Sequence, residues 1–153
     1  MALGYTTYKT PNAIFTIGSD LTGCEGFGVT LTGQGAVAIA PSTQNVPYGI
    51  VTVGGPSEDG VTYPGLIGGS SVEFVDMLGC TVQVQVSANG GVNAGEFVLI
   101  DITEPGTFVS NFNVTLVGGE WIWGYALTNC LAGEQCLIRF QPFLVQYVAP
   151  PPP

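Results

Sequence analysis

The sequence contains no histidine, and this absence narrows the chemistry that the chain can carry out. Histidine is the commonest general base, and both the serine triad and the cysteine–histidine pair depend on it. The sequence also has no G-x-x-x-x-G-K-[ST] phosphate loop, and its glycines stand between short apolar runs, where β-turns need them. We therefore predict that the protein is not an enzyme and that it uses no cofactor.

Two acidic pairs remain as candidates for metal binding or for carboxylate catalysis. Glu58 and Asp59 are adjacent, and Glu73 lies three residues before Asp76. Carboxylate oxygens bind calcium, and paired carboxylates cleave glycosides. However, the spacing of an EF-hand is missing, and few polar residues are available to hold a sugar. We interpret both pairs as solvated turns and predict no metal site.

The four cysteines offer thiol or disulfide chemistry. Cys24, Cys80, Cys130 and Cys136 form no C-x-x-C pair, and a zinc site would lack histidine. The first residues lack the basic and apolar regions of a secretory signal, which favours free, partly buried thiols. The alternative is a bridge between Cys130 and Cys136, because residues 131–135 could form a turn. Such a bridge needs Cα atoms within roughly 7 Å of each other.

Trp121 and Trp123 are the only tryptophans, and the alternation of side chains along a strand places both on one face. One interpretation is an exposed platform for a carbohydrate. The other is a core or subunit-interface face, because aromatic side chains are large apolar anchors. We assign both indoles to a core or subunit-interface face.

Charge is the most unusual feature of the composition, since charged residues make up 8% of the chain against roughly 25% in typical soluble domains. The mean hydropathy is +0.42, yet no run approaches the ~18 apolar residues of a membrane helix. The net charge is −9, and Lys9 and Arg139 are the only basic residues, so we predict no binding to nucleic acid or to membranes. Apolar surface normally marks an interface, so we expect burial against further copies or a partner.

Short apolar runs between glycine, proline and asparagine predict many short strands and no sustained helix. The clearest alternation places Thr81, Gln83 and Gln85 on the face opposite three valines. We predict an all-β domain, a compact β-barrel or β-sandwich of short antiparallel strands. The predicted strands are residues 27–32, 36–40, 46–53, 72–75, 80–86, 96–102, 112–117, 120–127 and 135–140.

Turn signals join several of these strands. Residues 33–35 predict a hairpin between the first two strands. Gly118 and Gly119 signal a two-residue hairpin between residues 112–117 and 120–127. Residues 128–133 could hold a single helical turn.

The length of 153 residues suits one domain with extended ends. Residues 1–17 favour extended backbone, and Pro11 resists both a helix and a central strand, so we predict an extended N-terminal arm. The alternative is that they form the first strand of the domain. The β domain then spans residues 18–144, and the proline-rich residues 145–153 form an extended tail.

Residues 20–33, DLTGCEGFGVTLTG, resemble the early segment of a family of small head proteins from tailed bacteriophages. Further matching pieces follow in order, and the resemblance covers about residues 18–140. The long N-terminal arm and residues 145–153 depart from the pattern of the family. The matching pieces after the first are residues 46–51, 79–84, 92–98, 123–127 and 132–138.

The family is similar to capsid decoration, or cement, proteins, which are β-rich, often trimeric, and bind the outside of an icosahedral head. The resemblance implies a virion protein on the outer capsid surface, made in the host cytoplasm, that stabilises the lattice. Its partners would be the major capsid protein and two further copies in a homotrimer. A reducing cytoplasm would keep Cys130 and Cys136 reduced. The alternative function is a surface binding module of a virion, such as a head-fibre or tail domain, that could bind carbohydrate.

The N-terminal arm is the segment that we expect to bind the capsid. An exposed sheet edge can capture a β-favouring strand through main-chain hydrogen bonds, and Lys9 could pair with an acidic group of the capsid protein. The residues assigned to this contact are Tyr5, Thr6, Thr7, Tyr8 and Lys9.

Overall fold

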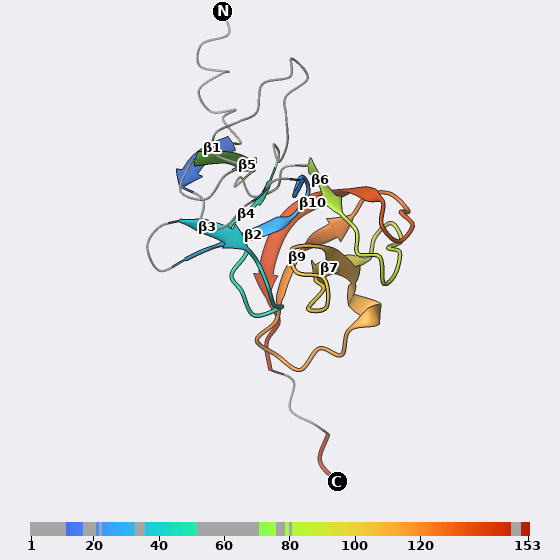
Figure 1. Cartoon of the computed structure of the whole chain (residues 1–153). Helices are drawn as coiled ribbons and strands as arrows, with labels where there is room; N and C mark the ends of the chain where they lie inside the picture. Colours follow the sequence, from blue (N-terminus) through green and yellow to red (C-terminus); the bar gives the residue numbers. More distant parts are fainter. Residues whose placement is uncertain are drawn as a thin grey trace, which may run out of the picture.

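The computed structural model describes residues 12–16, 21, 23–32, 36–51, 71–75, 79, 81–147 and 151–153. These residues form two antiparallel sheets of five strands each (Figure 1). The first sheet has the order β1 (Asn12–Thr16), β5 (Ser71–Val75), β4 (Gly49–Val51), β2 (Gly28–Leu31) and β3 (Val37–Ile39). The second has the order β6 (Thr81–Gln85), β10 (Gln135–Leu144), β9 (Trp121–Ala126), β7 (Phe97–Ile100) and β8 (Phe108–Ser110).

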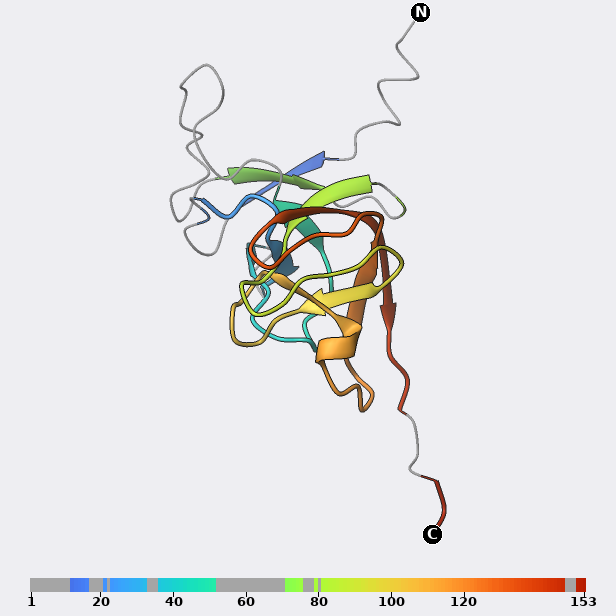
Figure 2. The same cartoon turned by 90° about the vertical axis from the view of Figure 1, so that its right-hand side faces the viewer.

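The predicted all-β fold is confirmed. Within the described ranges, the single helical element is the 3-10 helix η2 (Asn111–Asn113), and no helix there is long and apolar enough to cross a membrane. The two sheets do not close into a barrel, and of the two predicted architectures they are compatible with the sandwich. β1 and β5 lie at one end of the molecule, while β10 runs towards the other end (Figure 2).

The main core lies between the two sheets and is built around Trp123 of β9, which has no exposed area. Its indole packs edge-on against Phe108, with ring centroids 5.3 Å apart. From the first sheet, Ile50 enters the same cluster. A Cβ atom on Gly28 would lie 2.8 Å from the indole, so only glycine lets β2 approach the ring this closely.

The alternation predicted for residues 80–86 is confirmed in β6. Val82 and Val84 are buried, whereas Thr81 and Gln83 are exposed. The hairpin predicted from the apolar runs on either side of residues 33–35 is also confirmed, because β2 and β3 pair antiparallel. In β6 a period of two residues separates the core face from the opposite face.

The predicted strand at residues 112–117 is wrong. These residues form η2 and a loop, and the strand is β8, whose three residues are all buried. β8 ends at Ser110, which caps the N-terminus of η2. The Ser110 hydroxyl accepts a hydrogen bond from the backbone N–H of Phe112 within that helix. Gly118 and Gly119 lie in the loop before β9, so they do not join two strands. Residues 128–133 hold turns and an isolated bridge between Cys130 and Val92 in place of a helical turn.

The domain boundaries also differ from the prediction at both ends. β1 pairs with β5 along its whole length, so residues 12–16 belong to the first sheet and not to an arm. Residues 1–11, and with them the proposed capsid-binding residues, lie outside the described part. At the other end β10 runs to Leu144, and the backbone of Val145 bonds to Glu120 and Gly119. Val145 is therefore part of the domain, and the predicted tail starts too early.

Candidate functional site

Asp101 is a buried carboxylate at the centre of a cluster of hydrogen bonds. Oδ2 of Asp101 accepts bonds from the hydroxyl of Ser87 at 2.5 Å and from the amide of Asn89 at 2.8 Å. Oδ1 accepts bonds from the backbone N–H and the hydroxyl of Thr103. Burial acts to raise the pKa of Asp101, but these bonds outweigh it and lower the pKa to about 2. The carboxylate of Asp101 therefore holds the loop of Ser87 and Asn89 against its own loop.

Glu120 is a second buried carboxylate, and it accepts hydrogen bonds from the backbone. Its two oxygens accept bonds from the N–H groups of Val117 and Gly118. Burial acts to raise its pKa, but the backbone hydrogen bonds lower it overall. Asp101 and Glu120 line one depression of about 620 Å³. Because the oxygens of both carboxylates are bonded to the protein itself, this depression has no free base or metal ligand of that kind.

Sequence reasoning missed the roles of Asp101 and Glu120. The signal for Asp101 was local, because Asp-x-Thr and Ser-x-Asn segments form turns with side-chain bonds to nearby backbone. Within the described residues, no three metal-ligating side chains come together. Of the acidic pairs, Glu73 lies in β5, whereas Glu58, Asp59 and Asp76 lie outside the described part.

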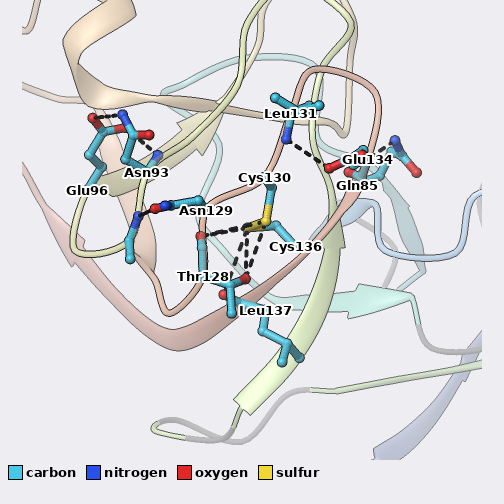
Figure 3. The surroundings of a disulfide bond; sticks show 11 residues. Gln85, Asn93, Glu96, Thr128, Asn129, Cys130, Leu131, Glu134, Cys136 and Leu137 are labelled. Atoms are coloured by element: carbon cyan, nitrogen blue, oxygen red, sulfur yellow. Dashed lines mark hydrogen bonds between the residues drawn. A yellow bond between two sulfur atoms is a disulfide. The ribbon is translucent and has the colours of Figure 1, made fainter.

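Cys130 and Cys136 form a disulfide, so the prediction that these thiols are free and reduced is wrong. The intervening turn brings their Cα atoms to 5.7 Å. The carboxylate of Glu134 closes this turn by accepting the backbone N–H of Leu131 at 2.9 Å, and Thr128 lies beside both sulfur atoms (Figure 3). The bridge joins the start of β10 to the segment that follows β9. Cys24 is partly buried against the cluster around Leu21, and Cys80 lies outside the described residues.

The two tryptophans have different surroundings. Trp123 is a core residue, because its side chain is completely buried within one chain. It leaves no exposed area for a sugar or a subunit to contact. Its Nε1 atom has no hydrogen-bond partner. Trp121 is partly buried, and its backbone N–H bonds to the carbonyl of Thr43. Only Trp121 retains exposed area for the predicted interface.

The pairing of β9 with β10 contains an irregularity close to Trp123. The register of the pair shifts between Phe140 and Phe143. A Cβ atom on Gly124 would collide with the carbonyl oxygen of Arg139, so glycine is required at the shift. Adjacent side chains of a strand point to opposite faces, so Trp123 joins the main core whereas Ile122 belongs to a separate cluster with Leu99.

The side of the second sheet opposite the main core is the outward face, and it is only partly covered. At one end Leu99, Val109 and Ile122 are buried beneath Val114, Leu116 and Val145. At the other end the strand pairing aligns Phe97 with Tyr125, Tyr125 with Arg139, and Leu137 with Gln83. Side chains paired in this way lie on the same side of a sheet. The open part of the outward face consists of Thr81, Gln83, Gln85, Phe97, Tyr125, Leu127, Gln135, Leu137, Arg139 and Phe143.

The apolar side chains of this open part remain exposed although they contact each other. Phe97 and Phe143 are each 42% exposed, and their rings meet edge to face with centroids 5.4 Å apart. Leu127 directly follows β9, and its backbone N–H bonds to the carbonyl of Leu137 in β10. Both leucines are 37% exposed. Beside them, Nη1 of the partly exposed Arg139 donates a bond of 2.6 Å to the carbonyl of Gly79. The open part therefore combines exposed apolar side chains with one guanidinium group.

Comparison with models of known protein families and with characterised proteins finds no match to this chain.

Proposed function

We propose that the protein is a capsid decoration, or cement, protein that binds the outer surface of a bacteriophage head and stabilises the lattice. The observation that carries this proposal is apolar surface on a chain with little charge. Among the described residues, 12 large apolar side chains are exposed, including 77% of Phe112 and 74% of Tyr147. Surface of this kind is usually buried in an assembly.

The core and the buried polar residues of the domain support a structural role. The two sheets bury a complete core of their own, so the exposed apolar residues are not needed to fill it. The buried carboxylates Asp101 and Glu120 are bonded to loops, and the sequence has no histidine. A stable domain with apolar joining surfaces is what a clamp against internal pressure requires. The net charge of −9 suits a location outside the head, away from packed DNA.

The rest of the proposal follows from the resemblance of residues 18–140 to phage head proteins. The chain assembles in the host cytoplasm as a homotrimer whose closed symmetry hides apolar patches, and it contacts the major capsid protein. It has no enzymatic activity and binds neither nucleic acid nor membrane. Residues 1–11, with Tyr5 and Tyr8, reach across a subunit boundary as an arm.

The test is the composition of heads from the phage that encodes the chain. Purified heads are separated from tails, and the ratio of this chain to the major capsid protein is measured by quantitative mass spectrometry. We expect a fixed ratio over several preparations, and heads that lack the chain should rupture at a lower temperature. Recovery of the chain only with tails or fibres would contradict the proposal and favour a binding module.

A further inference from the structure

The open part of the outward face differs in charge from the rest of the chain. The sequence has 11 acidic and two basic residues, yet no Asp or Glu occupies the outward positions of β6, β7, β9 and β10. The nearest carboxylates in sequence are engaged elsewhere, because Glu96 binds Asn93 and Glu134 binds Leu131. The four strands therefore present apolar rings and amides around one guanidinium group. Glu25 lies at the edge of the face, where it lines a depression with Thr81, Gln83 and Leu137.

Arg139 lies in the middle of this face, between Thr81 of β6 and Tyr125 of β9. Its Nη1 atom donates a hydrogen bond to the neutral carbonyl of Gly79. The chain has 11 acidic residues, yet none of the four strands of this face carries one to pair with the arginine. Arginine holds a carboxylate with two parallel hydrogen bonds, and it is enriched in the binding regions of interfaces.

The size of the face distinguishes between two classes of occupant. The open part crosses four strands at the usual spacing and extends along them for at most about six residues, so it presents no more than roughly 20 Å by 20 Å, or about 400 Å². A stable pair of proteins buries about 800 Å² on each partner. The face alone is therefore too small to hold two copies together. It is large enough for one contact among several on a repeating surface, where simultaneous contacts strengthen each other.

We propose that the open part of the outward face docks on the outer surface of the capsid lattice, at a spot where apolar side chains surround a carboxylate. This inference rests on the proposed function and adds the surface and the chemistry of the contact. Arg139 binds the carboxylate, and the Phe97–Phe143 pair fills the apolar surroundings. The four strands carry no carboxylate, so they place no like charge against the acidic group of the partner.

Binding to heads that lack the chain tests the proposal. One variant removes the two rings, Phe97→Ala with Phe143→Ala, and another removes the charge, Arg139→Gln. We expect each to weaken binding at least about tenfold, the usual size of a central interface contact. Arg139→Lys should retain part of the affinity, because the charge remains while the paired hydrogen bonds are lost. Raising the salt concentration should weaken the wild type more than Arg139→Gln.

Matched controls are available elsewhere on the chain. Leu31 of β2 is 42% exposed, as are Phe97 and Phe143, but it lies in the first sheet, so Leu31→Ala controls for loss of exposed apolar surface. Exposed Gln44 permits Gln44→Glu, which changes the net charge by the same amount as Arg139→Gln. Both controls should bind heads like the wild type. Circular dichroism and thermal unfolding check that every variant is folded.

The outcomes separate this inference from the proposed function. If the wild type binds and all face variants bind equally well, the docking face is refuted while the decoration function stands. If the wild type does not bind heads, both fail. If the face variants convert an oligomer of the free chain into monomers in sedimentation, the occupant is a second copy, and the capsid as occupant is overturned. Selective loss of head binding by folded face variants supports the proposal.

Discussion

The inner and outer faces of the second sheet use similar residues with opposite results. On the inner face, Trp123 and Phe108 pack edge to face and are completely buried. On the open outer face, Phe97 and Phe143 pack with nearly the same centroid distance, 5.4 Å, and remain 42% exposed. The inner pair is covered by the first sheet, whereas nothing in the described chain covers the outer pair.

This difference distinguishes the aromatic pair that stabilises the fold from the pair that remains available to another molecule. An aromatic pair contributes to folding in proportion to the area that folding removes from water. The inner pair loses all of its area within one chain, whereas the outer pair keeps area that only another molecule can bury. Along the outer face itself, the chain covers Leu99 and Ile122 with its own loop and Val145. The boundary between the covered and the open part therefore separates apolar residues that stabilise this chain from those that remain available to another molecule.

The largest effect that we predict is for the centre of the inner face. Trp123→Ala should lower the free energy of unfolding by about 3–5 kcal/mol, because it removes a large ring and leaves a cavity. Tyr125→Ala, on the outer side of the same strand, should cost less than about 1 kcal/mol. Urea denaturation of both variants provides the comparison. Equal losses would contradict the division between the two faces.

The disulfide should have the next largest effect, because it fixes the connection from β9 to β10 on which both faces depend. Cys130 and Cys136 are six residues apart, and closing so short a loop contributes about 2 kcal/mol. Cys130→Ala with Cys136→Ala should lose this amount, and reductant should destabilise the wild type equally. Alkylation without reductant, followed by mass spectrometry, should find the pair unmodified in released particles. Alkylation of Cys130 and Cys136 in these particles would contradict the disulfide and show that both thiols are free.

Acid should weaken the loops that end the second sheet, with a smaller effect. The folded-state pKa of Asp101, about 2, lies below its ordinary value of 3.8, so its contribution is complete above that value. It is lost as the pH falls through about 2. Asp101→Asn should cost about 1.5 kcal/mol at pH 7, in the range of bonds to a charged group. Between pH 5 and 2 the variant should lose less stability than the wild type, and parallel losses would refute this role.

The smallest effect on stability should come from removing residues 2–10, which end before β1. We expect the unfolding temperature to change little, since β1 and its pairing with β5 are retained. Binding to heads should weaken, because the arm carries Tyr5, Tyr8 and Lys9. Deletion of residues 2–16 is the comparison, and it should destabilise the first sheet. Unchanged head binding by the shorter deletion would exclude the arm as a clamp.

The sequence by itself determined the fold class and most of the strands. A period of two residues places Val82 and Val84 on one face and Thr81 and Gln83 on the other, whatever the rest of the chain does. Composition likewise excluded histidine chemistry and indicated apolar surface. These features depend on local pattern or on counts, which are complete before the chain folds.

Only the tertiary structure decided which apolar residues stay exposed. Trp123 and Tyr125 are both aromatic and stand two residues apart, but the register shift at Gly124 turns one into the core and the other outward. The disulfide and the Asp101 cluster likewise depend on which turns bring distant atoms together. Local pattern gives the period of a strand, but burial depends on what packs against each face, and that contact is made by residues far away in sequence.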